Sequence, residues 1–338
     1  MTKVAFFNVD EKEQALLSKE FAGEKTFELR FNQKSLDKHT ACIAKEAGGI
    51  GIFIQSEITQ EVLDHLPMVR VIATMSTGFD HIDLNACKAR NITVSNVPSY
   101  GDNTVAEYTF GLILALARKF KSTFDRIERG IFSRTGLIGI DIKGKTLGLI
   151  GTGRIGSHMA RLGWAFGMKV IAYDVRSDVA LKEKYGVEFM SLEEVLEQAD
   201  VISLHLPYLP STHHLINAER LRLLKPTALL INTSRGKLID TKAVAAALRE
   251  DRLGGVALDT FEGEDIWIEE EFLKHDDLPA IALREAMESF SIMRSERAIL
   301  TPHNAFNTRE ALERILIASA GNIKAFFSDN PENVVNIS

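Results

Sequence analysis

The sequence predicts an α/β fold with parallel sheets, and three observations carry that prediction. Apolar runs of about five to seven residues alternate with segments of helical period along most of the chain, as in repeated βαβ units. The chain has 338 residues, which is enough for about two domains, each with its own core. A glycine-rich turn follows one apolar run and opens a helix, where nucleotide-binding α/β domains carry their phosphate loop.

Composition excludes several classes of protein. Apolar residues make up 45% and charged residues 25%, which are ordinary globular values. Lys and Arg number 40 against 46 Asp and Glu, so the net charge of −6 offers no field for nucleic acid or anionic lipid, and we expect neither as a partner. Two cysteines, Cys42 and Cys87, form no disulfide framework or zinc spacing, and we expect a reducing compartment and no metal site. No window holds the roughly 18 apolar residues of a membrane span, so we expect a cytoplasmic protein.

In the first hundred residues we expect strands near residues 4–8, 50–54, 71–74 and 93–95. The first of these meets Asn8, Asp10 and Glu11 too soon for a signal peptide, so it is interpreted as a strand. Residues 103–129 show one long helical pattern, with Asp102 or Asn103 as the N-cap. Because it is apolar on more than one face, we expect that helix to brace two domains or two subunits.

A second α/β region begins at Lys145. Its strands are expected at residues 146–150, 170–173, 201–206, 228–232, 255–258 and 298–300. Ser191 and Glu194 form a capping box before a helix at 192–198, and Asp240 precedes a helix that starts at Thr241. The charged segment 265–297, which contains Trp267, is interpreted as a partly helical insertion.

The glycine-rich turn contains Gly151, Gly153 and Gly156. Glycines at this spacing let a backbone approach a pyrophosphate that lies on a helix N-terminus. Asp174 ends the next predicted strand, 18 residues after Gly156, where a carboxylate accepts the adenosine ribose hydroxyls and repels a 2′-phosphate. The pattern predicts a dinucleotide site and favours NAD over NADP. Arg176, two residues after Asp174, leaves NADP as the alternative cofactor.

Polar residues follow several strands of this second region, and parallel strands place their carboxyl ends at one edge of the sheet. Arg235 follows one strand and could hold an anionic substrate. His303 follows the last strand, and histidine titrates near neutrality, as a proton donor to a forming alkoxide requires. Glu262 and Glu264 lie in the loop behind a third strand, and a carboxylate beside such a histidine favours its protonated form. Taken alone, a strand-end histidine or arginine is often only structural.

Six segments occur in the order seen in one known family: residues 77–83, 103–107, 151–156, 232–236, 258–264 and 301–304. With them the chain resembles the D-isomer-specific 2-hydroxyacid dehydrogenases over nearly its whole length. Within that family it is most similar to D-lactate dehydrogenases, because of Tyr100 after Val-Pro-Ser, Phe306 after His303-Asn-Ala, and the long insertion. Met75, Gly101-Asp102 and Asp265 depart from the family pattern, and the first two lie near the expected substrate cleft.

The resemblance implies a flavodoxin-like substrate domain of residues 1–100 and 303–338, with a Rossmann NAD-binding domain of residues 101–302 inserted into it. It implies Arg235, Glu264 and His303 as the catalytic residues. Substrate would be bound by backbone amides near Thr77 and Gly78, with Tyr100 and Phe306 beside it. It also implies a homodimer joined through the cofactor domains. The candidate NAD-binding residues are Gly151, Gly153, Arg154, Ile155, Gly156, Asp174, His205, Leu206, Pro207, Thr212, Thr233, Ser234 and Asp259.

The sequence therefore predicts NAD-dependent reduction of a small 2-keto acid, with pyruvate as the first candidate. Glyoxylate, hydroxypyruvate and branched-chain 2-keto acids are the alternatives, because one pocket residue separates such substrates by only about 1–3 kcal/mol. A different class of function is an NAD(H)-sensing, corepressor-like scaffold, since relatives with this fold serve that way. Turnover on a panel of 2-keto acids with NADH separates these possibilities.

Overall fold

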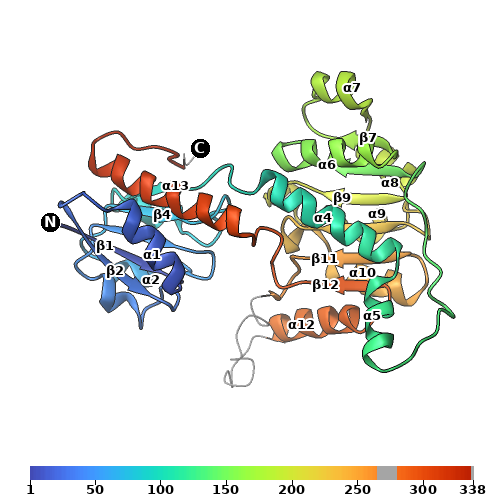
Figure 1. Ribbon diagram of the computed structural model, residues 1–338, viewed down its shortest axis with the longest axis horizontal. Coiled ribbons are helices and arrows are strands. Elements are labelled where there is room, and N and C mark those ends of the chain that lie inside the picture. Colours follow the sequence, from blue (N-terminus) through green and yellow to red (C-terminus); the bar gives the residue numbers. More distant parts are fainter. Residues whose placement is uncertain (265–279, 336–338) are drawn as a thin grey trace. The chain divides into compact units, whose positions relative to one another are not determined.

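The computed structural model describes residues 1–264 and 280–335, and its backbone contacts divide the chain into two compact units. The first unit consists of Met1–Tyr100 and Asn307–Ser338, and the second of Gly101–Phe306 (Figure 1). The chain thus leaves the first unit once and returns to it at residue 307. The sequence predicts this return at residue 303. The backbone contacts instead group residues 303–306, including His303, with the second unit.

The first unit contains a five-stranded, wholly parallel sheet in the order β2-β1-β3-β4-β5, which is the flavodoxin-like order. Its strands are β1 Thr2–Phe7, β2 Phe27–Asn32, β3 Gly49–Ile52, β4 Val71–Thr74 and β5 Thr93–Ser95. Its helices are α1 Glu11–Glu20, α2 Gln60–Asp64, α3 Leu84–Ala89 and α13 Arg309–Phe327, with a 3₁₀ turn at Ala41–Ala44. The prediction missed β2, although its residues alternate apolar with polar as those of a half-buried edge strand do.

Helix α13 joins the C-terminal segment to the first unit by packing on β3 and β4 and beside α1 (Figure 1). An added Cβ at Gly49 would lie 3.2 Å from the Phe327 ring, so the glycine gives that ring its place against the sheet. The Arg70 guanidinium lies over the rings of Phe326 and Phe327, 5.5 and 4.9 Å from their centroids.

The second unit contains a seven-stranded parallel sheet in the order β12-β11-β10-β9-β6-β7-β8, the Rossmann order extended by one strand. Its strands are β6 Thr146–Ile150, β7 Lys169–Tyr173, β8 Glu188–Phe189, β9 Val201–Leu204, β10 Leu229–Asn232, β11 Gly255–Leu258 and β12 Ala298–Leu300. Its helices include α6 Arg154–Ala165, α7 Val179–Tyr185, α8 Leu192–Gln198, α9 Ala218–Leu221, α10 Thr241–Arg249 and α12 Ala280–Met293. The chain reverses its direction of strand addition between β6 and β9, the point at which such sheets bind nucleotides.

The single long helix predicted at 103–129 is wrong. The chain forms α4, Asp102–Ala117, and α5, Phe120–Glu128, separated at Lys119, which has a left-handed φ of 52°. The Ile140 N–H donates to the Ala117 carbonyl at 2.8 Å, so a segment that returns from further along the chain satisfies the end of α4. The N-cap is Gly101, without a side-chain cap, and not Asp102 or Asn103.

The other local predictions concern two helix caps, the charged insertion and membrane-spanning helices. The capping box of Ser191 and Glu194 and the Asp240 cap before α10 are confirmed. Of the predicted insertion, residues 265–279 with Trp267 lie outside the described residues, and Ala280–Met293 form α12. Over the part of the chain that is described, no helix combines the length and apolar character needed to cross a bilayer.

Candidate active site

The glycine turn after β6 forms a cradle for a phosphate group. Gly151 has a φ of 97°, and an added Cβ there would lie 2.5 Å from the His205 carbonyl oxygen. An added Cβ at Gly156 would lie 2.2 Å from the Gly151 oxygen, so this glycine allows α6 to pack on the turn. A Cβ at Gly153 meets nothing within 4 Å, and Gly153 caps α6 without any side-chain hydrogen bond. The space beside Gly153 at the start of α6 is therefore open, which fits a dinucleotide pyrophosphate.

Asp174 follows β7 and is tied to this turn. Its carboxylate accepts hydrogen bonds from the Thr152 N–H at 2.6 Å and the Thr152 hydroxyl at 2.9 Å, and from the Arg176 N–H at 3.1 Å. Partial burial raises the pKa of Asp174, but these hydrogen bonds outweigh it and hold that pKa below its ordinary value. The site therefore presents a fixed carboxylate where the ribose of a dinucleotide is expected. Thr152 was not among the predicted residues, although it lies within the glycine motif.

His205 lies at the reversal point of the sheet, where its N–H donates to the Ile150 carbonyl at 2.8 Å. Its Nε2 lies 2.9 Å from the hydroxyl of fully buried Ser203, and its Nδ1 is buried without a hydrogen-bond partner. Although part of the residue reaches solvent, this burial of the ring lowers the pKa of His205 to about 3, so the imidazole is neutral.

The loop that follows His205 is closed by its own hydrogen bonds. The Thr212 hydroxyl donates to the Pro207 carbonyl and accepts from the Leu209 N–H at 2.8 Å. Leu206, which precedes this loop, packs against the core of the second unit. The side chain of Thr212 thus stabilises the loop, and its contact with a cofactor stays a prediction.

The loop that carries Arg235 starts from buried Asn232, at the end of β10. The Asn232 amide donates to the Arg235 carbonyl at 2.8 Å and to the Thr260 carbonyl at 3.4 Å, and its oxygen accepts from the Ser234 N–H. The Arg235 guanidinium donates to the Ser234 carbonyl at 2.8 Å. Asn232 thus joins the Arg235 loop to the loop after β11, a role the prediction did not assign to it.

Two other predicted cofactor residues of this loop use their hydroxyls inside the protein. The Thr233 hydroxyl lies 2.8 Å from that of Thr109 on α4, and the Ser234 hydroxyl donates to the Leu204 carbonyl at 2.5 Å. Their contact with a cofactor stays a prediction.

His303 and Glu264, which are 39 residues apart in the chain, lie side by side. The Nδ1 of His303 is 3.2 Å from Oε1 of Glu264, and the two side chains are 23% and 21% exposed. The other carboxylate oxygen of Glu264 accepts the Phe261 N–H at 3.2 Å, which fixes its orientation. The ring of Phe306 meets the His303 ring edge-on, with centroids 6.4 Å apart. The arrangement can hold a protonated imidazole against an ionised carboxylate.

Asp259 holds the turn that bears His303. Its fully buried carboxylate accepts hydrogen bonds from the Thr301 hydroxyl at 2.5 Å and from the N–H groups of Asn304 and Ala305 at 2.8 and 2.9 Å. Its carbonyl accepts the His303 N–H at 3.0 Å, and His303 itself has a left-handed φ of 49°. Asp259 was predicted to bind the cofactor, whereas the structure gives its carboxylate these partners within the protein.

In the first unit the predicted substrate loop is held by side chains around it. The Thr77 hydroxyl donates to the Val97 carbonyl at 2.8 Å, the Asn96 amide donates to the Thr77 carbonyl at 2.7 Å, and the Ser76 hydroxyl donates to the Gly78 carbonyl at 2.6 Å. The Tyr100 carbonyl accepts from Arg314 at 2.7 Å. Hydrogen bonds from Ser76, Thr77 and Asn96 thus hold the backbone of this loop.

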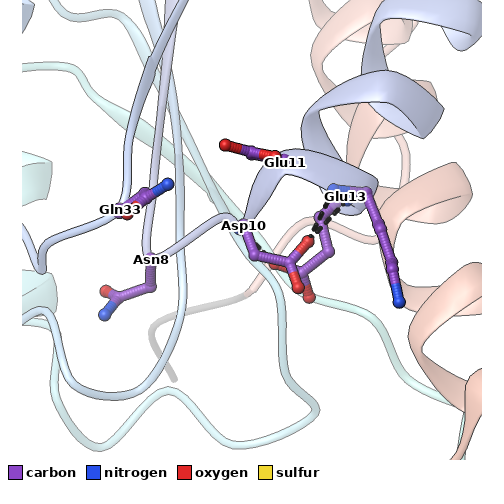
Figure 2. Close-up of a pocket in the computed structure, with 6 residues that line it drawn as sticks. Asn8, Asp10, Glu11, Glu13 and Gln33 are labelled. Carbon is purple, nitrogen blue, oxygen red and sulfur yellow. Dashed lines mark hydrogen bonds between the residues drawn. The ribbon is translucent and has the colours of Figure 1, made fainter.

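A separate cavity of about 540 Å³ lies in the first unit beside the start of α1 (Figure 2). Asn8, Asp10, Glu11, Lys12, Glu13 and Gln33 line it. Asp10 and Glu13 form the capping box of α1, so their carboxylates serve that helix. Among the residues that the structure describes, no group of three or more His, Cys, Asp or Glu side chains is placed to hold a metal ion.

The strand order and the glycine cradle define a dinucleotide-binding α/β protein. The sequence profile of the D-isomer specific 2-hydroxyacid dehydrogenase NAD binding domain matches residues 110–305. The chain is 37% identical to D-lactate dehydrogenase kk1H of Curvularia clavata, with 88% of this chain and 83% of that protein covered. It is 35% identical to a glyoxylate reductase of Aeropyrum pernix, with 87% and 84% covered. The crystal structure of Aquifex aeolicus D-lactate dehydrogenase complexed with NAD and lactic acid is similar, with a TM-score of 0.88, 37% identity, and 99% and 100% of the two chains covered.

The chain belongs to the D-isomer specific 2-hydroxyacid dehydrogenase family, and residues 110–305 are its NAD-binding domain. The predicted family, fold class and cofactor are thereby confirmed.

Proposed function

We propose that this protein reduces a small 2-keto acid to the D-2-hydroxy acid with NADH, and catalyses the reverse reaction, with pyruvate as the preferred substrate. The observation that carries the proposal is the His303–Glu264 pair, which lies beyond β11 and β12 of the sheet that bears the dinucleotide cradle. NADH, when bound, supplies the hydride that reduces the keto carbon.

His303 is the proton donor in this proposal. Its Nδ1 faces Glu264 at 3.2 Å, which leaves Nε2 as the nitrogen that gives its proton to the carbonyl oxygen during reduction. An ionised Glu264 stabilises the imidazolium and fixes the ring, and in the reverse reaction neutral His303 takes the proton back.

Arg235 binds the substrate carboxylate and polarises the carbonyl, because its planar guanidinium offers a fork of donors that matches two oxygens. The backbone N–H groups of Thr77 and Gly78 are proposed to bind the same carboxylate, with Tyr100 and Phe306 beside the substrate side chain. The hydrogen bonds that order the 76–78 loop support this role.

Pyruvate is the first candidate because D-lactate dehydrogenases are among the similar proteins, and glyoxylate is the alternative that the 35% identical glyoxylate reductase favours. The test is the kcat/KM for NADH oxidation with pyruvate, glyoxylate, hydroxypyruvate and a branched-chain 2-keto acid, together with the chirality of the product. We expect the highest value with pyruvate and D-lactate as product. NADH binding without turnover of any 2-keto acid would favour the sensing scaffold instead.

Two variants test the residue roles. Arg235→Lys should raise the KM for the keto acid and lower kcat together, with little change in NADH binding. Glu264→Gln, which removes the charge beside His303 but keeps the shape of the side chain, should lower kcat for reduction with little change in NADH binding. An unchanged kcat in Glu264→Gln would show that this carboxylate does not support the proton donor.

We also propose that two chains form a homodimer through their cofactor domains. Large apolar side chains are exposed on α5 and on the stretch that follows it. They are Phe120, Phe124, Ile127, Ile131, Phe132, Ile138 and Ile140. A contiguous stretch of this kind is typical of a surface that another chain covers. The two free cysteines, Cys42 and Cys87, support the proposed reducing, cytoplasmic compartment.

A further inference from the structure

We propose that His214 and Glu262 form a second histidine–glutamate pair, whose task is to position the loops that carry Arg235 and Glu264. His214 and Glu262 are positioning residues, which act on the reaction only through the places of the Arg235 and Glu264 side chains. This inference rests on the proposed function, because it takes Arg235 and Glu264 as residues of the reaction.

The pair itself is close and largely shielded. Nε2 of His214 lies 2.6 Å from Oε1 of Glu262, and the two side chains are 34% and 10% exposed. The residues are 48 positions apart in the chain, so tertiary packing alone brings them together. Hydrogen bonds in which one partner is charged are among the stronger ones in proteins.

Glu262 is anchored on three sides. Its Oε2 accepts the N–H of Thr241, the first residue of α10, at 3.1 Å, and its carbonyl accepts the Ser289 hydroxyl of α12 at 3.1 Å. The third anchor is His214. Only Gly263, with a left-handed φ of 76°, separates Glu262 from Glu264, so the anchored residue determines where the Glu264 backbone starts.

His214 reaches the Arg235 loop as well. Its N–H donates to the Lys237 carbonyl at 2.8 Å, two residues after Arg235. An added Cβ at Gly236 would lie 2.4 Å from the Phe261 carbonyl carbon, so the backbones of the two loops are in direct contact. His214 thus contacts the Arg235 loop through its backbone and the Glu264 loop through its ring.

The neighbouring histidine provides a matched control. The His213 ring stacks on His214 with centroids 3.9 Å apart, and its Nδ1 lies 3.5 Å from the Tyr208 hydroxyl. His213 is exposed, and its ring contacts Tyr208 and His214. Loss of the His213 ring therefore removes similar bulk from the same loop without breaking the proposed pair.

The experiment compares His214→Leu, His214→Gln, Glu262→Gln and His213→Leu with the unmodified enzyme in steady-state reduction of pyruvate across pH. His214→Leu should lower kcat and raise the pyruvate KM, with a combined loss of about tenfold to a hundredfold in kcat/KM, because small displacements of reacting groups are costly. NADH affinity should stay unchanged, because Thr212 closes the 207–212 loop independently.

His214→Gln, which keeps an N–H donor near the Nε2 position, should recover most of the loss. The kcat/KM of Glu262→Gln should lie between those of His214→Leu and His214→Gln. His213→Leu should have the kcat/KM of the unmodified enzyme. The inference is overturned if His214→Leu keeps unchanged kcat and KM. It is equally overturned if activity falls only in proportion to folded protein, with an unchanged pyruvate KM and no recovery in His214→Gln. Arg235→Lys and Glu264→Gln, measured in parallel, report on the proposed function separately, because their full activity would contradict that function whatever His214 does.

Discussion

Asp174 and His205 lie on either side of the glycine turn, and each is held in one charge state by its surroundings. Hydrogen bonds from Thr152 and Arg176 keep the Asp174 carboxylate ionised. Enclosure of the His205 ring keeps its imidazole neutral. The edge of the sheet beside the glycine turn therefore carries a fixed negative charge and a fixed neutral ring.

Asp174 should determine the choice of cofactor. A carboxylate that faces a 2′-phosphate adds charge repulsion to the loss of the ribose hydrogen bonds, so NADH should be strongly preferred over NADPH. Asp174→Ala should raise the KM for NADH. It should also reduce the preference for NADH over NADPH to within a few-fold, because it removes the charge repulsion against the 2′-phosphate. The ratio of kcat/KM for the two cofactors measures this. Equal values in the unmodified enzyme would contradict the prediction and direct attention to Arg176.

His205 should make folding sensitive to mild acid. Because its pKa falls to about 3 in the folded state, only the unfolded chain binds a proton as the pH drops below about 6.5, and the free energy of unfolding decreases there. Between about pH 7 and pH 5, protonation of His205 in the unfolded chain should lower the free energy of unfolding by on the order of 2 kcal/mol. Urea unfolding of His205→Gln should show a correspondingly weaker pH dependence, whereas His213→Gln should not. Parallel curves for His205→Gln and the unmodified protein would refute the assignment.

At the scale of elements, the contact between α6 and the turn after β6 requires a residue without a side chain at position 156. A Cβ at Gly156 would lie 2.2 Å from the Gly151 oxygen, which is backbone and cannot turn away. A Cβ at Gly153 meets nothing within 4 Å. The same three-glycine motif thus contains Gly156, which packing requires, and Gly153, which borders an open space.

Gly156→Ala and Gly153→Ala should separate these two requirements. Gly156→Ala should destabilise the fold by about 1–3 kcal/mol, as overpacking does, and lower the thermal midpoint. Gly153→Ala should keep the thermal midpoint of the protein without cofactor but weaken NADH binding, measured by fluorescence titration. Equal thermal loss in both variants would show that the open space at Gly153 is not the ligand approach.

At the scale of the whole molecule, the exposed apolar stretch on α5 and beyond it predicts the oligomeric state. Phe124 and Phe132 are 61% and 97% exposed, and charges there should prevent association. Light scattering should show a dimer for the unmodified protein and a monomer for the double variant Phe124→Glu/Phe132→Glu. Met68→Glu, at an exposed apolar site of the first unit, should stay dimeric. A monomeric unmodified protein would contradict the proposed dimer.

The sequence by itself determined the parallel α/β architecture and most of the strand positions. Buried parallel strands are continuous apolar runs, so β4, β6, β11 and β12 lie where the sequence places them. Because parallel strands align their carboxyl ends, the strand order indicated that Glu262, Glu264 and His303 share one edge of the sheet, and the family resemblance selected Glu264 as the partner of His303.

The tertiary structure alone decided the features that depend on distant partners. The break between α4 and α5 is accompanied by a hydrogen bond from Ile140, and the edge strand β2 has no continuous apolar run of its own. Asp259 became an anchor of the His303 turn, and His214 met Glu262 across 48 residues. Local sequence reports the preferences of neighbours within one element, whereas these contacts exist only because the packed sheet brings separate loops together.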